Sequence, residues 1–174
     1  MLRSPTESDV PLMRGWRNQP ANRAVSLQQH EISRQEHLAW WERTRRDPSR
    51  EVVVFEIDGT PCGVVSYFDV HREVNPASAS WGFYLDHDGL TRLGATFVAW
   101  NRVMKEAVDH AFDDLGLDLL TAEVLEHNRA VRIANRRFGF VEAPPELREV
   151  DGQQLSVIRV SLRREDRRRP KETT

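Results

Sequence analysis

Two apolar runs flank Asp58-Gly59 in the stretch "EVVVFEIDGTPCGVVSYFDV", residues 51–70, and this pattern leaves few options for the fold. An Asp-Gly pair between such runs favours the two-residue turn of a β-hairpin, because both turn positions take positive φ. A second hairpin pattern surrounds Asp151-Gly152 near the end of the chain. Much of the sheet must therefore be antiparallel.

A long amphipathic helix is predicted between the two hairpins, from about Thr96 to Leu115. Gly116 follows at the expected stop, and a strand-like run, "DLLTAEVL", comes next. A helix between two strands is the usual crossover that joins parallel neighbours, so one strand pair is expected to run parallel. The apolar face of the helix repeats at helical spacing and consists of Phe97, Trp100, Met104, Ala107, Val108, Ala111, Phe112 and Leu115.

Shorter elements complete the order. Helices are expected within residues 5–17 and from Ser33, where Glu36 three residues later suggests a capping box. The run "ASASWGFYL" predicts a third strand after the first hairpin, and a short helix is expected between Asn128 and Gly139. Strands and helices in this order predict one α+β domain over residues 1–162, with a mixed, mostly antiparallel sheet.

Composition narrows the class of protein. The formal net charge is −2, with 25 basic and 27 acidic residues among 174, so no overall field favours nucleic acid. No apolar run is long enough for a membrane span and no signal segment is evident, which favours an intracellular chain, with the cytoplasm as the default. The single Cys62 lies in an apolar run and is interpreted as a small buried hydrophobe. The last residues, 163–174, read "RREDRRRPKETT" and predict a basic, disordered tail.

Several motifs fall in an order that resembles the GNAT superfamily of acyl-CoA-dependent N-acyltransferases over nearly the whole chain. They are "SWGFYL", "RLGAT" and "NRAVRIANRRFGF". Two further stretches, "WRNQP" and "QEHLAWW", are similar to the branch that contains amino-sugar-nucleotide N-acetyltransferases of the pseudaminic-acid pathway and ribosomal-protein-alanine acetyltransferases. The resemblance implies a twisted sheet with a V-shaped splay between two central strands, flanked by helices, and acetyl-CoA as cosubstrate.

The resemblance also implies where acetyl-CoA binds. The strand before the long helix exposes backbone groups that can pair with the pantetheine arm, and the first N–H groups of the helix suit a pyrophosphate. The connecting loop, "DHDGLTRLGAT", departs from the family pattern: aligned on Gly94, it has Gly89 at the first position and Arg92 at that of the first glycine. The cofactor-binding residues expected in this way are Phe83, Tyr84, Leu85, Leu90, Thr91, Arg92, Leu93, Gly94, Ala95, Thr96, Asn128 and Asn135.

Three residues are candidates for catalysis. Asn135 occupies the position where many GNAT enzymes carry the tyrosine that protonates the leaving thiolate. An amide cannot be that acid but can donate a hydrogen bond to the sulfur or to the acyl oxygen; a partly exposed helical Asn without a role is the alternative. Glu123 is a candidate general base, and a solvated or capping carboxylate is its alternative. Tyr84 is a candidate acid, with core packing as its alternative. The six histidines show no metal-ligand spacing, so no metal is predicted.

The resemblance places the acceptor near Trp16, Arg17, Asn18 and His37. The function it implies is direct transfer of an acetyl group to a primary amine of a small molecule, such as an amino sugar or a sugar nucleotide. Two alternatives remain open: a protein N-terminal acetyltransferase of the ribosomal-protein type, and an acyl-CoA-binding GNAT domain without turnover. The oligomeric state, including a homodimer, is also open, and no nucleic-acid or membrane partner is expected.

Overall fold

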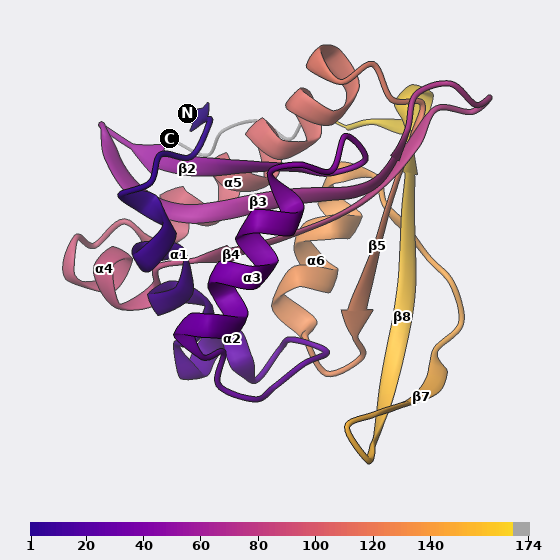
Figure 1. Ribbon diagram of the computed structural model, residues 1–174. Coiled ribbons are helices and arrows are strands. Elements are labelled where there is room, and N and C mark those ends of the chain that lie inside the picture. The colour runs from indigo at the N-terminus through magenta and orange to yellow at the C-terminus, as the bar shows by residue number, and fades with distance from the viewer. Residues whose placement is uncertain (169–174) are drawn as a thin grey trace.

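The computed structural model describes residues 1–168 and shows a twisted sheet with helices on both faces (Figure 1). The strands are β1 (Leu2–Arg3), β2 (Glu51–Ile57), β3 (Thr60–His71), β4 (Ser78–Leu85), β5 (Leu119–Leu125), β6 (Val141–Glu142), β7 (Glu146–Val150) and β8 (Gln153–Arg163). The helices are α1 (Asp9–Arg17), α2 (Pro20–Arg23), α3 (Arg34–Thr44), α4 (His87–Arg92), α5 (Thr96–Asp109) and α6 (Arg129–Phe138).

The strand order in the sheet is β1-β2-β3-β4-β5-β8-β6, and β7 also pairs with β8. Only the β4–β5 pair is parallel within the described residues. Both predicted hairpin turns have two successive residues with positive φ: Asp58 at 49° and Gly59 at 77°, then Asp151 at 50° and Gly152 at 76°. The α+β class, the mostly antiparallel sheet and the two hairpins are therefore confirmed.

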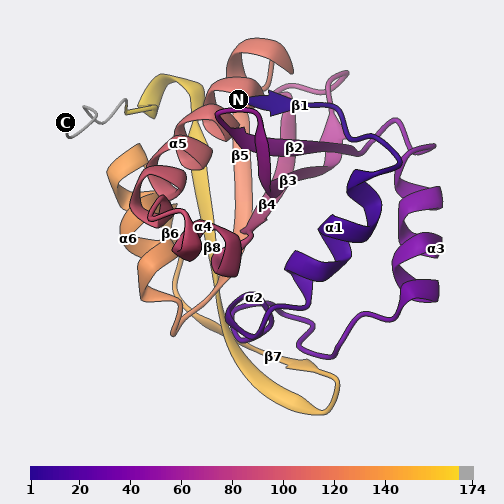
Figure 2. The same cartoon turned by 90° about the vertical axis from the view of Figure 1, so that its left-hand side faces the viewer.

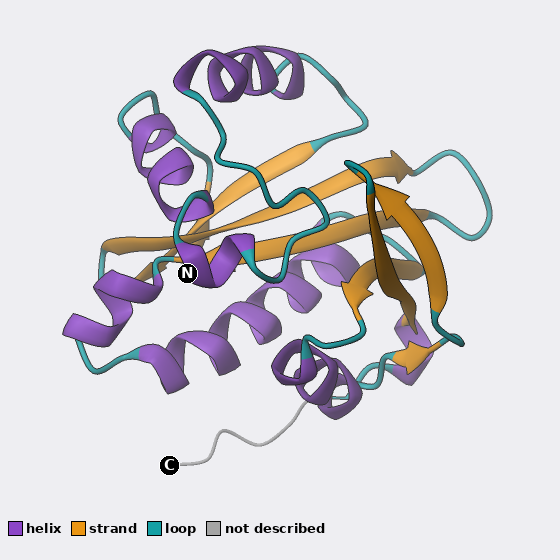
Figure 3. Cartoon of the chain, turned by 90° about the horizontal axis from the view of Figure 1, so that it is seen from below, coloured by secondary structure: helices purple, strands orange, loops and turns teal. Residues whose placement is uncertain are grey.

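Helices cover the two faces of the sheet (Figures 2 and 3), and each face carries a separate core. Alternation along β2 divides them, because Val52 and Val54 pack with α1 and α3, whereas Val53 and Phe55 pack in the larger core with α5 and α6. The helices on the α1–α3 face come from residues 9–44. The α5–α6 face contains the long helix and the helix that ends at Gly139, whose φ is 101°.

The central strands part after a short parallel ladder. β4 pairs with β5 only between Ser78 and Ser80, which face Leu119 and Thr121 respectively. The hydroxyls of Ser80 and Thr121 lie 3.1 Å apart at the last rung. Beyond it both strands continue without pairing to each other, and Figure 1 shows them diverging. The predicted V-shaped splay is confirmed.

The segment before α5 differs from the expected loop, because residues 87–92 form the short helix α4. Asp86 caps this helix by accepting a hydrogen bond from the Gly89 N–H at 3.0 Å. A Cβ at position 89 would collide with the Asp86 carboxylate, so a larger residue there would displace the cap. The predicted long helix also changes character before Leu115, because α5 ends at Asp109 and residues 110–114 form a π-helical turn.

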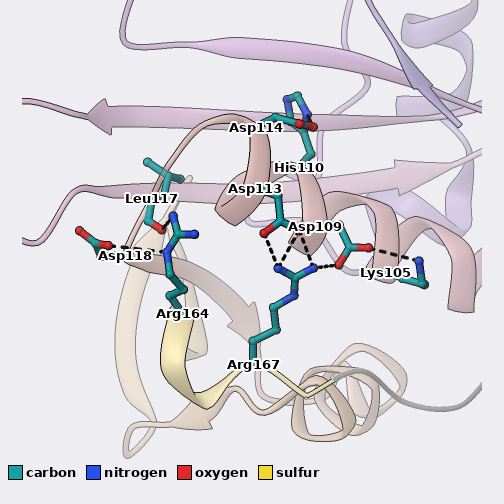
Figure 4. A network of polar contacts seen from close by, with 9 residues as sticks. All are labelled: Lys105, Asp109, His110, Asp113, Asp114, Leu117, Asp118, Arg164 and Arg167. Atoms are coloured by element: carbon teal, nitrogen blue, oxygen red, sulfur yellow. Dashed lines mark hydrogen bonds and ion pairs between the residues drawn. The ribbon is translucent and has the colours of Figure 1, made fainter.

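The prediction of a disordered tail from Arg163 is wrong for residues 163–168. β8 runs to Arg163, a 3₁₀ turn follows, and the Arg167 guanidinium pairs with the carboxylates of Asp109 and Asp113 (Figure 4). Arg164 donates a hydrogen bond to the Leu117 carbonyl at 2.6 Å. Arg167 is ordered because it meets acidic groups at the end of α5 and in the turn that follows, and Arg164 because it meets a carbonyl and the Asp118 carboxylate before β5. The rest of that prediction, residues 169–174, lies outside the described residues.

Candidate active site

A cavity of about 320 Å³ lies in the wedge between the diverging ends of β4 and β5; we call it the wedge cavity. Past their shared ladder, alternate backbone groups of each strand point toward the other strand without reaching it. Trp81 and Phe83 form an aromatic wall with ring centroids 5.7 Å apart, and Trp100 of α5 meets Phe83 edge-on at 5.4 Å. Helix α6 supplies Ala130, Val131 and Asn135 to the opposite side.

Asn135 is the most informative residue of the wedge cavity. Its side chain is only 1% exposed, and its Oδ1 is buried with no hydrogen-bond partner. A buried amide oxygen without a donor costs about 1–3 kcal/mol. The wedge cavity therefore presents an open strand edge beside an acceptor atom that lacks a donor. An extended ligand that carries amide N–H groups would satisfy both.

A second and larger cavity, of about 940 Å³, opens on the α1–α3 side of the sheet; we call it the acceptor cavity. It has in common with the wedge cavity Trp81 and Gly82 of β4, Ala122 and Glu123 of β5, and two residues of the loop after α2. The two cavities therefore meet at the throat, defined by Gly82 and Ala122, just past the last rung of the parallel ladder. The fold thus lets two molecules meet from opposite faces of one sheet.

A family model described as "Acetyltransferase (GNAT) domain" matches residues 1–141. The chain belongs to the GNAT acetyltransferases. It is an acetyl-CoA-dependent N-acetyltransferase, and the resemblance inferred from its motifs is confirmed. No curated protein sequence matches it.

Solved structures share the fold at low sequence identity. Spermidine N-acetyltransferase from Vibrio cholerae, solved with CoA and spermine, has a TM-score of 0.79 at 17% identity and covers 95% of this chain and 96% of its own. Ribosomal-protein-alanine N-acetyltransferase from Brucella melitensis has a TM-score of 0.72 at 20% identity, with coverage of 94% and 99%. The Campylobacter jejuni N-acetyltransferase PseH, in complex with acetyl coenzyme A, has a TM-score of 0.65 at 17% identity, with coverage of 94% and 99%.

The wedge cavity of this GNAT chain fits a pantetheine arm, which is a narrow chain with two amide groups. Phe83, Tyr84 and Leu85 lie on its β4 wall, as predicted, and Asn128 and Asn135 lie on its α6 side. Asn128 also caps α6 by accepting a hydrogen bond from the Val131 N–H at 3.4 Å. The helix expected between Asn128 and Gly139 is therefore confirmed, with Asn128 as its N-cap.

The predicted pyrophosphate loop is largely occupied by its own hydrogen bonds. The N–H groups of Leu90, Leu93, Gly94 and Ala95 all donate to carbonyls within residues 86–91. The Leu90 side chain is 0% exposed and packs in the core, so its position explains it as a core residue; the expected contact with a ligand stays a prediction. What remains for an anion is the start of α5 at Thr96, which has no side-chain cap and no acidic residue in its first turn, beside the exposed Arg92. Thr91 and Leu93 are exposed next to it.

The structure separates the four predicted acceptor residues. Arg17 alone lines the acceptor cavity. Trp16 is 6% exposed and packs in the α1–α3 core, while Asn18 binds both the N–H and the carbonyl of Ile32, at 2.8 and 2.9 Å. His37 is 5% exposed, and its burial lowers its pKa. Trp16, Asn18 and His37 therefore lie where they stabilise the packing of the α1–α3 layer.

Glu123 lies at the junction of the two cavities, where a base would be needed, but its carboxylate is engaged. Arg148 of β7 donates two hydrogen bonds to it at 2.7 Å each, and Arg159 lies 4.0 Å away. The hydrogen bonds from Arg148 lower the pKa of Glu123. A carboxylate held in this way is a weak base at neutral pH.

Tyr84 faces the α1–α3 side of β4 and also borders the wedge cavity. Burial raises the pKa of its hydroxyl, and the neighbouring Arg17 guanidinium acts in the opposite direction. A hydroxyl with a raised pKa keeps its proton at neutral pH and can donate a hydrogen bond. The role of Tyr84 as an acid stays a prediction.

Sequence reasoning missed a polar cluster that fixes the end of β4. Asn22 of α2 donates to the Leu85 carbonyl at 2.8 Å and to the Trp16 carbonyl at 2.7 Å, and His87 lies 3.1 Å from its oxygen. Gln19 donates to the Asp86 carboxylate at 2.7 Å. Helix α2 thereby holds β4 in place where it has left β5. Short polar helices such as "PANR" give almost no periodic signal, so only the adjacent "WRNQP" motif pointed here.

Among residues 1–168, no group of three or more His, Cys, Asp and Glu side chains is placed to hold a metal ion. Within the same residues, none of the helices has the length and apolar character that crossing a membrane requires. Cys62 is buried, and burial raises the pKa of its thiol to about 11. The thiol is therefore protonated at neutral pH and unsuited to nucleophilic attack.

Proposed function

We propose that this GNAT enzyme transfers an acetyl group from acetyl-CoA directly to a primary amine of a small molecule, an amino sugar or a sugar nucleotide. The observation that carries the proposal is the throat, where the wedge cavity meets a separate cavity on the other face of the sheet. Acetyl-CoA would lie in the wedge with its thioester at the throat. The acceptor would enter from the α1–α3 side.

A cavity of about 940 Å³ is within the usual range for small-molecule sites, roughly 300–1,000 Å³. Its walls come from the loop after α2 on one side and from Val150 and Arg159 of the terminal hairpin on the other. The named amine substrates of the structural neighbours include a polyamine and a protein alanine, so neighbours alone do not select the acceptor. A cavity of this volume favours a compact acceptor over an extended peptide.

In the proposed reaction, the neutral amine nitrogen attacks the thioester carbonyl, a C–N bond forms, and the C–S bond breaks. The amine loses a proton and the leaving thiolate gains one. Backbone N–H groups on the open edge of β4 would stabilise the developing oxyanion, and the two cavities would hold the reactants in attack geometry. Proximity of this kind is worth on the order of 7 kcal/mol or more, so turnover does not require a tyrosine at position 135.

The three candidate catalytic residues take specific places in this proposal. Asn135 would bind an amide N–H of the pantetheine arm through its unpartnered oxygen and so set the depth of the thioester. Tyr84 would donate a hydrogen bond near the acceptor. Glu123 would remain ionised and paired with Arg148, and water would carry the proton away from the amine.

Incubation of the purified protein with acetyl-CoA and a panel of amines tests the proposal. Thiol release together with a product mass increase of one acetyl group identifies turnover and the acceptor. Acetylation of amino sugars or sugar nucleotides above peptide N-termini is the expected result. Acetyl-CoA binding without turnover of any amine would instead establish the acyl-CoA-binding alternative.

A further inference from the structure

One cation on the wall of the acceptor cavity lacks a counter-ion. Arg17 donates from Nη2 to the Gln28 carbonyl at 2.7 Å, but its Nη1 is buried and has no hydrogen-bond partner. An unmade hydrogen bond on a buried charged group is more costly than one on a neutral group. Arg17 therefore brings to the wall of the acceptor cavity a cation whose hydrogen-bonding capacity is not filled.

The surrounding charges do not neutralise Arg17. No carboxylate within residues 1–168 forms an ion pair with it. Glu123, which also lines the acceptor cavity, is engaged by Arg148 and approached by Arg159. Burial is the main cause that lowers the pKa of Arg17; Arg23 acts in the same direction, and the Glu36 carboxylate, which forms no ion pair with it, acts in the opposite direction. Asp69 is the fourth charged residue of the lining, and it is exposed to solvent.

We propose that Arg17 binds an anionic group of the acceptor, so that the substrate is an amine that also carries a carboxylate or a phosphate. The inference rests on the proposed function and narrows its acceptor class. A guanidinium presents a planar set of donors that matches both oxyanions, and its anchor on the Gln28 carbonyl fixes its direction. The anionic group would lie at Arg17 while the amine of the same molecule reaches the throat.

The same charges disfavour a polycation. A polyamine would bring only positive charge to a wall that already carries an unpaired guanidinium, and the Glu123 carboxylate is committed to Arg148. This inference therefore separates the chain from spermidine N-acetyltransferases, whose fold it shares. Like charges in a partly buried site repel appreciably.

Matched acceptor pairs test the proposal with the full-length protein. The pairs are phosphoethanolamine with ethanolamine, glucosamine 6-phosphate with glucosamine, and glycine with glycinamide; spermidine serves as the polycation. Acetylation gives kcat/KM, and calorimetric titration of each amine into the CoA-bound protein gives Kd independently of turnover. The anionic member should exceed its neutral partner by roughly tenfold to a hundredfold in at least one pair, the range of a charge-assisted hydrogen bond. The pair that shows it distinguishes phosphate from carboxylate.

Variants of Arg17 connect the preference to this side chain. Arg17→Gln should bring the anionic-to-neutral ratio close to one, mainly through KM and Kd, and Arg17→Lys should retain part of the preference. Arg14→Gln is the matched control, because Arg14 also donates to a carbonyl of the same loop, that of Ile32 at 3.1 Å, but does not line the acceptor cavity. The control should leave the ratio unchanged.

Equal or better use of neutral amines or spermidine by the wild type would overturn the proposal. An unchanged ratio in Arg17→Gln would overturn it as well. Absence of turnover with every amine would refute the proposed function, and the calorimetric ratios would still decide whether Arg17 binds an anion. Should Arg17→Gln fail to fold, Arg17→Lys decides. The shorter lysine side chain, with an ammonium in place of the guanidinium, must lower the anionic-to-neutral ratio, and an unaltered ratio contradicts the inference.

Discussion

The wedge cavity and the acceptor cavity meet at one throat, yet they are built from different materials. The wedge cavity is formed by strand edges, aromatic rings and small or amide side chains from β4, β5 and α6. The acceptor cavity is larger, and its lining includes Arg17, Asp69, Glu123 and Arg159 from four separate elements. Recognition on the first side rests on backbone that many sequences can supply. Recognition on the second side rests on particular side chains and so is particular to this chain.

The largest effect is expected at the throat itself. Gly82 has no heavy atom within 4 Å of the position that a Cβ would occupy, so Gly82→Leu should fold normally. The new side chain would fill the passage between the cavities and displace the amine from the thioester. We expect kcat/KM to fall by about 100-fold or more, with little change in the melting temperature.

Gly15→Leu is the matched control, because position 15 is also open and lies on the exposed side of α1. It should leave both activity and melting temperature nearly unchanged. Full activity in Gly82→Leu would show that the two cavities do not work as one site.

A smaller effect is expected from Asn135→Leu, which tests the wedge cavity alone. The substitution removes a buried oxygen that has no partner, so the free protein should be as stable as the wild type or more stable by about 1 kcal/mol. Turnover should fall and acetyl-CoA binding should weaken, each by roughly tenfold. Denaturation curves with and without acetyl-CoA measure the stability and the binding, and acetyl-transfer kinetics measure the turnover.

Asn128→Ala should lower the stability of the free protein, which is the opposite of the effect expected for Asn135→Leu, because Asn128 caps α6. Loss of a cap typically costs about 1 kcal/mol in the free protein. If Asn135→Leu destabilised the protein while acetyl-CoA binding stayed intact, the amide would be structural.

On the acceptor side, Arg148→Gln and Glu123→Gln should have similar, severalfold effects on the acceptor KM and little effect on acetyl-CoA. The ion pair lowers the pKa of Glu123, so the carboxylate is ionised across the neutral range and any limb it causes in a pH–rate profile lies on the acid side. Arg148→Gln should move that limb upward in pH. A general base at position 123 would instead make Glu123→Gln lose about 100-fold or more in kcat, far beyond Arg148→Gln.

The smallest effect concerns a site outside both cavities and should change stability only. His110 lies 2.7 Å from Glu51 and 2.8 Å from Asp114, and the hydrogen bond with Glu51 is the main cause that raises its pKa. The charged form is favoured in the folded state, so the stabilisation is complete below the ordinary histidine pKa and is lost as pH rises through the raised value. His110→Gln should remove that pH dependence.

Denaturant titrations from about pH 5 to about pH 9 measure the slope, with acetyl-transfer kinetics at one pH as the control. A change in the KM of either substrate would show that this region communicates with the cavities, and would weaken the two-cavity comparison.

The elements with strong periodic or turn signals were predictable from the sequence. Asp-Gly turns require positive φ at both positions, and Ser33 accepts the hydrogen bond expected of a cap from the Glu36 N–H at 3.1 Å. The second half of the expected capping box is absent because the Glu36 carboxylate contacts His30 instead, at 2.9 Å. Competition of this kind between local and distant partners cannot be read from spacing.

The candidate site was predictable where backbone defines it and less so where side chains do. The splay and the positions of Phe83 and Asn135 followed from motif order. The engagement of Glu123 depended on Arg148, which is 25 residues away in the chain and reaches it only after the terminal hairpin has formed. The ion pair between Arg167 and Asp109 likewise joins residues that are 58 positions apart in the chain. Long-range ion pairs leave no periodic trace in a sequence.

A sheet that parts in its middle carries a hazard that outer edges usually present: unpaired strand backbone can recruit other chains and start aggregation. Here the outer edges are formed by short strands, which can template little pairing: β1 on one side, with two residues, and β6 and β7 beside β8 on the other, with two and five residues. The long open edges of β4 and β5 lie in a recess that α2, α5 and α6 border. A foreign strand with bulky side chains on both faces would have to displace these helices, whereas a single unbranched chain can slip between them. The recess thus hinders self-association through this edge and leaves room for the pantetheine arm that we propose to bind there.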